Sequence, residues 1–223
     1  MGKAMLGVID LMLSVLPGAG AARDPTLGAA RDHHPSVTVL VADITGFEDP
    51  AVSPTEREVE AALGTIFAGF DRIAAANGLR STWTPGDPYV ATAGLGRSGL
   101  DHADRATVTG LQLIPCLAAF ARRTGTRLHA RVGISSGAVM AGSVGDRRFI
   151  YDLWGETLQV ASRLEREGVA DRVLVSESTR CLLGPRFQLE RRNAPANVRI
   201  DPAAAWFVTP YRASLDADRC IVG

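Results

Sequence analysis

Two aspartates stand where folding could bring carboxylates together. Asp43 closes the β-rich apolar run 37–42, and Asp87 follows Pro85-Gly86 between two segments that predict a β-hairpin. A buried strand would deliver Asp43 to its C-terminal end, and the hairpin turn would carry Asp87. Two carboxylates at one sheet edge suit a hard divalent cation such as Mg²⁺, which also takes phosphate oxygens. The alternative is that each aspartate is a separate turn residue.

Two glycine-rich segments match known motifs only in part. Residues 94–99 fit GxGxxG, but the next strand ends without the acid that a dinucleotide site needs. Residues 133–137 fit GxSxG, but all four histidines precede Ser135, whereas that hydrolase architecture places its histidine after the serine. The sequence therefore excludes a serine hydrolase of this type and does not favour a dinucleotide fold.

Composition narrows the classes of partner and compartment. The 223 residues carry 24 basic and 24 acidic side chains, so no general attraction to nucleic acid or an anionic membrane is expected. Lys3 is the only lysine, which excludes functions that need another. The three cysteines are Cys116, Cys181 and Cys220, too scattered for a disulfide framework. They indicate a reducing compartment, so we expect a cytoplasmic location.

The elements that must position these residues alternate between strands and helices. Ser53, Pro54 and Glu56 predict a helix start, and Asn77-Gly78 predict its end. Further helices are expected at about 101–123, 156–167 and from 177, and strands at 37–43, 79–84, 89–93, 127–134, 138–151, 172–175 and near 187 and 206. This order predicts an α/β (α+β) fold, a ferredoxin-like βαββαβ sheet with helices on one face.

Three segments carry distinctive motifs in a fixed order. They are V-L-V-A-D-I-T-G-F at 39–47, R-V-G-I-S-S-G-A-V-M-A-G at 131–142 and Y-D-L-W-G-E-T-L-Q-V-A-S-R-L-E at 151–165, with V-S-E-S-T following at 175–179. In this order and spacing they resemble the catalytic domain of class III adenylate and guanylate cyclases of the bacterial, receptor and membrane-cyclase type. The resemblance covers about residues 37–210. It implies a nucleotidyl cyclase fold and a head-to-tail homodimer with shared active sites.

The resemblance also implies a role for each matching residue. Asp43 and Asp87 would hold two Mg²⁺ or Mn²⁺ ions. The backbone of four residues would cradle the triphosphate of ATP: Ile44, Thr45, Gly46 and Phe47. The second protomer would supply Asp152 at the base, Gln159 at the ribose, Arg163 at the reacting phosphate and Arg199 on the terminal phosphates, and Trp83 would stand at the base-selecting position.

Base selection is where the chain departs most from the family. Trp83 occupies the position at which adenylate cyclases of this family have lysine and guanylate cyclases have glutamate. An indole cannot reproduce the charged contact of a lysine, and it can instead serve sheet-face packing. Asp152 is the residue type associated with adenine, although it can equally be a polar position of a hairpin.

The remaining departures concern the helix and the terminal phosphates. Gln159 replaces asparagine with a side chain one methylene longer, and a displaced amide lowers the rate; it can otherwise be a polar position of the helix face. Arg199 replaces lysine and keeps the charge. Arg163 stands one helical turn before Glu167, so a purely structural ion pair is the alternative to catalysis.

The expected function is adenylate cyclase: conversion of ATP to 3′,5′-cyclic AMP and pyrophosphate, weak or loosely base-selective. The alternatives are a catalytically silent cyclase-like module that binds nucleotide or only dimerises, and a guanylate cyclase. Apolar spacing predicts a signalling helix at 4–16, so we expect this helix and a linker in 1–36, the catalytic domain in 37–212 and a tail in 213–223. The domain could follow an upstream sensor or belong to the cytoplasmic side of a membrane protein.

Overall fold

A computed structural model describes residues 31–47, 55–83, 86–95, 99–143, 151–192 and 205–209, with the backbone alone for 31–32, 140–143 and 151–154. The expected helix at 4–16 lies outside these ranges. The elements are, in order, β1 (Arg31–Thr45), α2 (Glu56–Ala76), β2 (Arg80–Thr82), β3 (Tyr89–Ala93), α3 (His102–Thr124), β4 (His129–Ser143), β5 (Tyr151–Trp154), α4 (Glu156–Arg166), β6 (Arg172–Ser176), α5 (Glu177–Arg180), β7 (Gln188–Arg191) and β8 (Ala205–Thr209).

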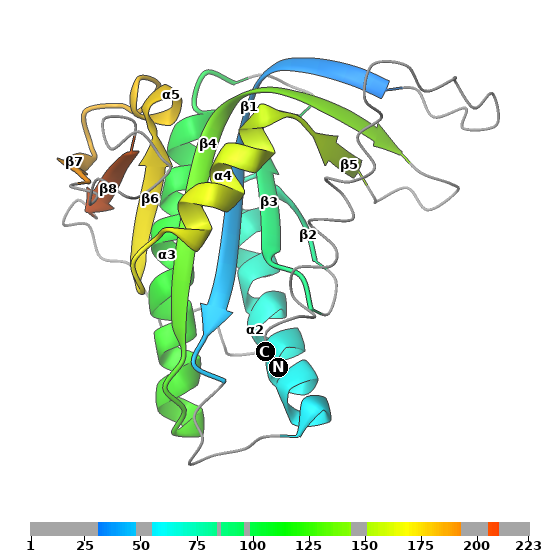
Figure 1. The fold of residues 1–223 in the computed structure, drawn as a ribbon, viewed down its shortest axis with the longest axis vertical. Helices are drawn as coiled ribbons and strands as arrows, with labels where there is room; N and C mark the ends of the chain where they lie inside the picture. Colours follow the sequence, from blue (N-terminus) through cyan, green and yellow to red (C-terminus); the bar gives the residue numbers. More distant parts are fainter. Residues whose placement is uncertain are drawn as a thin grey trace.

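The strands of the described ranges pair into one sheet in the order β2-β3-β1-β4-β6-β8-β7, with β5 paired to β4 (Figure 1). The sequence of elements from β1 to β4, together with the antiparallel pairing of β2, β3, β1 and β4, confirms the ferredoxin-like βαββαβ core. β6 then joins β4 in parallel, which requires a crossover, and α4 supplies it.

The helices cover both faces of the sheet, whereas the sequence led us to expect them on one. α2 and α3 pack behind the sheet in Figure 1, and α4 crosses its front. Gly133 explains the close approach of α4: a Cβ there would lie 2.2 Å from the Ala161 carbonyl oxygen and 2.3 Å from the Glu165 nitrogen. Glycine lets the backbone of α4 lie directly on β4.

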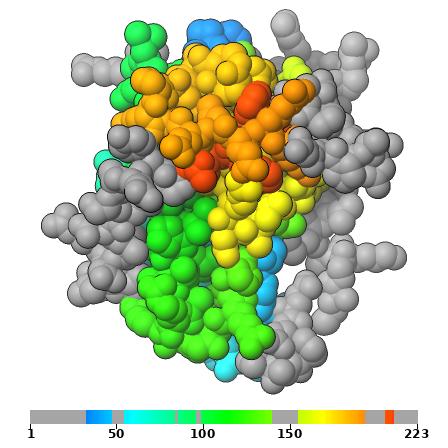
Figure 2. Space-filling view, turned by 90° about the vertical axis from the view of Figure 1, so that its left-hand side faces the viewer, coloured from blue at the N-terminus to red at the C-terminus, as the bar shows by residue number. Residues whose placement is uncertain are grey.

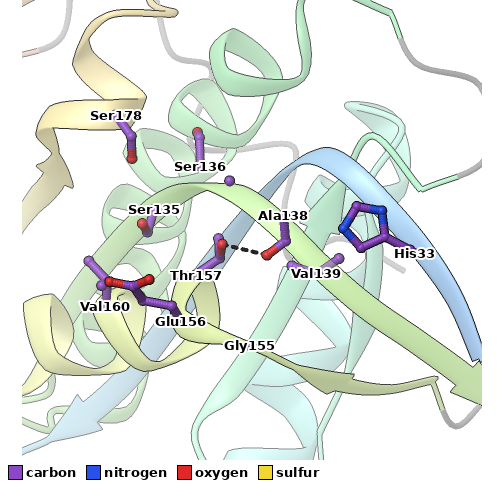
Figure 3. A pocket seen from close by; sticks show the side chains of 11 residues that line it. His33, Ser135, Ser136, Ala138, Val139, Gly155, Glu156, Thr157, Val160 and Ser178 are labelled. Atoms are coloured by element: carbon purple, nitrogen blue, oxygen red, sulfur yellow. Dashed lines mark hydrogen bonds between the residues drawn. The ribbon is translucent and has the colours of Figure 1, made fainter.

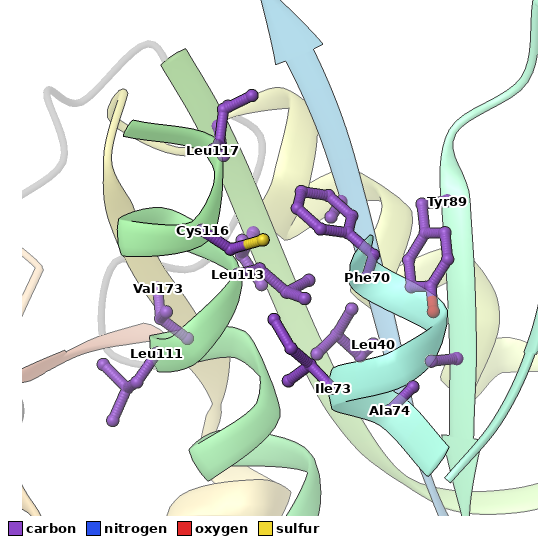
Figure 4. Close-up of a cluster of buried hydrophobic side chains, with 14 of the residues drawn as sticks. Leu40, Phe70, Ile73, Ala74, Tyr89, Leu111, Leu113, Cys116, Leu117 and Val173 are labelled. Atoms are coloured by element: carbon purple, nitrogen blue, oxygen red, sulfur yellow. The ribbon is translucent and has the colours of Figure 1, made fainter. Parts of the chain in front are cut away.

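The main core fills the space between the sheet and the two long helices (Figure 4). Leu40, Tyr89, Phe70 and Leu113 are fully buried there. Each large side chain of this kind contributes about 1.5–3 kcal/mol when it leaves water. A smaller cluster around Val39 and Ala161 lies on the other face, beneath α4. The strands at the centre of the sheet are therefore held from both sides.

Helix α2 begins two residues later than its sequence signals suggested. Thr55, not Ser53, is the N-cap residue: its Oγ1 accepts from the Glu58 N–H at 3.3 Å, while Glu58 Oε2 accepts from the Thr55 N–H at 2.8 Å. This reciprocal capping box satisfies two backbone donors at the helix start. Ser53 lies outside the described residues.

Two strands are longer than expected. β1 begins at Arg31, six residues before the expected boundary, because residues 31–34 pair with 139–142 of β4. The strand expected at 127–134 and the first part of the strand expected at 138–151 are joined in the single strand β4, which ends at Ser143. The first part of β1, the last part of β4 and β5 extend beyond the long helices at the upper right of Figure 1.

A chain of neutral hydrogen bonds crosses the middle of the molecule. His102 lies 3.0 Å from Ser36 through Nε2 and 2.7 Å from Thr38 through Nδ1, and Thr38 Oγ1 lies 2.7 Å from Ser136 Oγ. We call the whole set the hydroxyl chain: Ser36, His102, Thr38, Ser136, Thr179, Ser176, Ser135 and Ser178. Burial, with Arg105 nearby, lowers the pKa of His102. The imidazole is thus a buried structural group.

The sheet ends with β8 and β7 on the side away from the β2–β3 hairpin. Figure 2 shows these residues, orange to red, above the green surface of α3 and β4. Within the described ranges, no helix has both the length and the apolar character needed to cross a membrane.

Candidate active site

Asp43 lies near the C-terminal end of β1, as the sequence predicts. Its cross-strand partner on β4 is Arg131, and Arg131 Nη2 lies 2.9 Å from Asp43 Oδ2. The Asp43 side chain is only 14% exposed. The arginine therefore fixes one carboxylate oxygen, while the other has no hydrogen-bond partner among the described residues.

Asp87 comes to the same edge through the β2–β3 hairpin. The last register pair of β1 and β3 is Ala42 with Tyr89. Continued by two residues, this register would set the backbone of Asp87 opposite that of Ile44, so Asp87 belongs to the same end of the sheet as Asp43. Burial raises the pKa of Asp87, and no donor or cation in the described ranges compensates its charge. We call this end of the sheet, with Asp43 and Asp87, the acid edge.

The acid edge suits a hard cation. Asp87 is a partly desolvated carboxylate without a partner in the described ranges, and such a group is favourable beside a metal ion. Across those ranges, no three His, Cys, Asp or Glu side chains gather at a metal-binding distance. A Mg²⁺ ion held by Asp43 and Asp87 would complete its shell with water or phosphate oxygens.

The turn 44–47, as we call the last two residues of β1 and the two that follow, is anchored to the chain that leads into β4. Gly46 has φ 108°, and a Cβ there would lie 2.0 Å from the Arg127 carbonyl oxygen, so only glycine fits. Ile44 is buried and Phe47 packs against the main core. Thr45 Oγ1 donates to the His129 carbonyl oxygen at 3.5 Å. A backbone turn held this firmly is suited to present its amides to a phosphate.

Arg131 and Glu165 complete the acid edge, and sequence reasoning did not single them out. Arg131 Nη2 lies 3.1 Å from Glu165 Oε1 as well as near Asp43. Glu165 is only 3% exposed; its burial, and then the charge of Asp43, raise the pKa of Glu165 to about 7. The available signal was an arginine within an apolar strand, but its partners depend on the strand register.

Gln159 and Arg163 lie one turn apart on α4, so they share a side of the helix. Arg163 is exposed and Gln159 is half-buried. Arg163 forms no ion pair with Glu167, which is instead 3.4 Å from Arg192. Within the described ranges no acid pairs with Arg163, so its guanidinium is available to a ligand or a second protomer.

Trp83 packs onto the main core instead of standing free. Its ring centroid lies 5.1 Å from that of Phe67 on α2, at an interplanar angle of 58°. It directly follows β2, four residues before Asp87. This contact accounts for the indole as a packing group and leaves only its exposed part for a ligand.

Two expected base and phosphate contacts are less fully described. Asp152 lies in β5, where its backbone pairs with Gly142 of β4; of its side chain nothing is described. Arg199 lies outside the described residues.

A separate polar hollow of about 520 Å³ lies near the N-terminus of α4 (Figure 3). Ser135, Ser136 and Ser178 contribute hydroxyls to it, and Glu156 and His33 lie at its sides. None of the expected site residues lines this hollow. Ser135 stands inside β4 and donates to Ser176 at 3.2 Å, an arrangement that agrees with the exclusion of a serine nucleophile.

Comparison with known proteins identifies the same family over most of the chain. The sequence model of the family described as the adenylate and guanylate cyclase catalytic domain matches residues 30–208. An adenylate cyclase of Mycobacterium tuberculosis is 31% identical over 184 residues, which are 82% of this chain and 42% of the relative. A membrane guanylyl cyclase of Dictyostelium discoideum is 31% identical over 162 residues, 72% of this chain and 11% of the relative. The chain thus spans less than half of either relative.

Solved structures give the same result. The guanylate cyclase domain of RhGC from Catenaria anguillulae, in complex with GTP, is 30% identical with a TM-score of 0.71, over 81% of this chain and 100% of that domain. A dimeric guanylyl cyclase domain from Blastocladiella emersonii is 28% identical with a TM-score of 0.73, over 83% and 99%. Relatives named for adenylate and for guanylate chemistry are both present, so the comparisons do not distinguish ATP from GTP.

Proposed function

The chain belongs to the family of adenylate and guanylate cyclase catalytic domains, and on that premise we propose that it converts ATP to 3′,5′-cyclic AMP and pyrophosphate. The observation that carries the proposal is the acid edge, where Asp43 lies at the end of β1 beside an anchored turn and the β2–β3 hairpin carries Asp87 at the same end of the sheet. A carboxylate pair next to a backbone cradle is what a metal-bound triphosphate requires.

Asp43 and Asp87 would hold Mg²⁺ or Mn²⁺, and we propose two ions. When bound, the ions would lower the pKa of the ribose 3′-hydroxyl and neutralise charge on the pyrophosphate leaving group. Arg131 acts as a positioning residue, because it holds one oxygen of Asp43 through a 2.9 Å ion pair. The backbone of 44–47 would bind the triphosphate and align the α-phosphorus for in-line attack.

A second protomer would complete each site in a head-to-tail homodimer. Its Gln159 would orient the ribose, and its Arg163 would stabilise the charge that develops on the reacting phosphate. The support is that Arg163 is exposed and pairs with no acid within the described ranges. Arg199 of the second protomer would contact the terminal phosphates.

Base selection would rest on Asp152 more than on Trp83. An aspartate can accept the adenine amino group, which favours ATP. Trp83 contacts Phe67 and carries no charge, so it supplies no strong selection between adenine and guanine. We therefore propose an adenylate cyclase with loose base selectivity.

One observation favours a second candidate, a silent cyclase-like module that binds nucleotide or only dimerises. Trp83 packs on the core at the base-selecting position, and Gln159 is longer than the family's asparagine. If this candidate is right, the double variant Trp83→Lys, Gln159→Asn should gain cyclase activity that the wild-type protein lacks.

A product assay tests the proposal directly. Wild-type protein at high concentration with Mn²⁺ is given ATP or GTP in separate reactions, and cyclic AMP and cyclic GMP are measured. We expect cyclic AMP in excess, and none above background from Asp43→Asn. Cyclic GMP alone would favour the guanylate cyclase, and no product from folded, dimeric wild-type protein would favour the silent module.

A further inference from the structure

A histidine–aspartate pair lies at the start of β4, beside the turn 44–47. His129 Nδ1 is 2.6 Å from Asp171 Oδ2, and Asp171 Oδ1 accepts a hydrogen bond from the Ala130 N–H at 3.1 Å. The Asp171 N–H donates to the Ala130 carbonyl oxygen at 2.7 Å. Asp171 is therefore fixed to β4 through its backbone and both carboxylate oxygens.

The backbone of Asp171 is held in an unfavourable conformation. Its φ is 59°, and it is the one non-glycine residue of the described ranges with positive φ. Such conformations persist where the surroundings enforce them, often at functional sites. The core does not require this pair, because the side chains of His129 and Asp171 are 49% and 43% exposed. The strained residue thus orients an exposed imidazole.

His129 lies on the same face of the sheet as Asp43. The register pairs His129 with Thr45 and Arg131 with Asp43, and Ala130 between them points into the main core. Alternate residues of a strand share a face, so His129 and Arg131 form one row across from Thr45 and Asp43. The imidazole therefore stands beside the turn that we propose for the triphosphate.

Of this row, His129 is the side chain with an uncommitted ring nitrogen. Arg131 already pairs with Asp43 and Glu165. Nδ1 of the imidazole is hydrogen-bonded to Asp171, and Nε2 makes no hydrogen bond within the described ranges. A protonated imidazole donates from both nitrogens, and a phosphate oxygen is a strong acceptor for such a donor.

We propose that His129, oriented by Asp171, is a further substrate-binding residue that contacts the terminal phosphate of the nucleotide and the pyrophosphate product. This inference rests on the proposed function, because it takes the turn 44–47 as the triphosphate cradle. His129 would bind and Asp171 would position it. No bond is made or broken at either residue.

The test separates phosphate binding from turnover. In His129→Ala, we expect the KM for ATP and the inhibition constant of pyrophosphate both to rise about tenfold, because one charge-assisted hydrogen bond is lost. The kcat should stay within about twofold of the wild-type value. Asp171→Gly keeps a residue suited to φ 59° but removes the carboxylate, and should raise both constants about threefold. His33→Ala, an exposed histidine at the separate hollow, is the matched control and should change neither.

Calorimetric titration with pyrophosphate and Mn²⁺ makes the result independent of product formation. If wild-type protein binds pyrophosphate without making cyclic nucleotide, the proposed function fails, while weaker binding by His129→Ala would still support the inference. If His129→Ala matches wild type in pyrophosphate affinity, or loses kcat with unchanged KM, the inference is overturned while the proposed function stands. No pyrophosphate binding by folded wild-type protein overturns the inference as well.

Discussion

The start and the middle of β4 carry two polar clusters of different kinds. At the start, Arg131 joins Asp43 to the buried Glu165. In the middle, Ser136 belongs to the hydroxyl chain, whose members are neutral and hydrogen-bonded to one another. At the acid edge, by contrast, Arg131 Nε is buried without a hydrogen-bond partner within the described ranges, and the pKa of Glu165 is raised to about 7.

The difference separates a structural cluster from a candidate functional one. A satisfied neutral network fixes elements with little electrostatic cost, and the hydroxyl chain ties β1, α3, β4 and α5 together. A charged, incompletely satisfied cluster costs stability and is typical of functional sites, where perturbed pKa values also gather. Variants at the acid edge should therefore change activity as well as stability, whereas variants of the hydroxyl chain should change stability alone.

The largest effect is expected from Arg131→Met. It leaves Asp43 and Glu165 facing each other without a cation, and breaking a buried pair of this kind costs about 3 kcal/mol or more of unfolding free energy. Cyclic AMP formation should also be lost. Urea unfolding and the product assay measure both effects.

The control for Arg131→Met is Arg122→Met, an exposed arginine in the last turn of α3. It should stay within about 0.5 kcal/mol of wild type. An Arg131→Met protein as stable and active as this control would mean that the two clusters do not differ.

Glu165→Gln should change how stability depends on pH. The pKa of Glu165 rises from 4.5 in the unfolded chain to about 7 in the fold, so between these values the folded state holds a proton that the unfolded state releases. This contribution is fully present below about pH 4.5 and is lost as pH rises through about 7, on the order of 3 kcal/mol.

Urea unfolding of wild type and Glu165→Gln at several pH values tests this slope. The variant lacks the titrating carboxyl, so its stability should not fall over the same range, and it should exceed wild type above about pH 7. Parallel stability curves for the two proteins would contradict the prediction.

Thr38→Val should destabilise without altering the chemistry. Valine keeps the shape of Thr38 but leaves His102 and Ser136 each without one partner, which costs about 2 kcal/mol. Turnover per folded molecule should remain that of wild type. Thr38→Ser retains the hydroxyl and should recover most of the loss, so equal loss in both variants would point to packing instead of hydrogen bonding.

The smallest expected effect is the contribution of His102 to the pH dependence of stability, which has the opposite sign to that of Glu165. Burial lowers the pKa of His102 below 6.5, so the unfolded chain takes up a proton that the folded state resists. Stability is then lost as pH falls below about 6.5, by less than about 1 kcal/mol down to pH 5.5. The single variant Glu165→Gln is compared with the double variant that also carries His102→Gln, so the difference in their stabilities isolates the contribution of His102. If this difference does not change with pH, His102 takes up its proton in the folded state.

Much of the fold follows from local signals, but the placement of α4 does not. Apolar periodicity predicts the βαββαβ order, and turn residues predict the hairpin before Tyr89. The position of α4 depends on the contact of Gly133 with Ala161, which joins segments distant in sequence. Likewise, residues 31–36 carry no strand pattern of their own, and only pairing with β4 makes Arg31 the start of β1.

The same distinction holds at the acid edge. The positions of Asp43 at the end of a strand and of Asp87 in a turn could be predicted, because each follows a local strand or turn signal, whereas their role as metal ligands remains a prediction. Arg131 and Glu165 could not, because their contact with Asp43 depends on a strand register and on which side of the sheet α4 lies. The roles of Gln159 and Arg163 remain predictions, since they concern a second protomer.

The most direct test of the shared-site account is complementation between two inactive variants. Asp43→Asn removes the metal side of each site and Arg163→Ala removes the partner side, so each homodimer should make no cyclic AMP. If sites are built from two protomers, a one-to-one mixture forms heterodimers with one intact site, and about a quarter of wild-type activity should return. A mixture as inactive as its components, although heterodimers are shown to form, would contradict the account, as would cyclic AMP formation by Asp43→Asn alone.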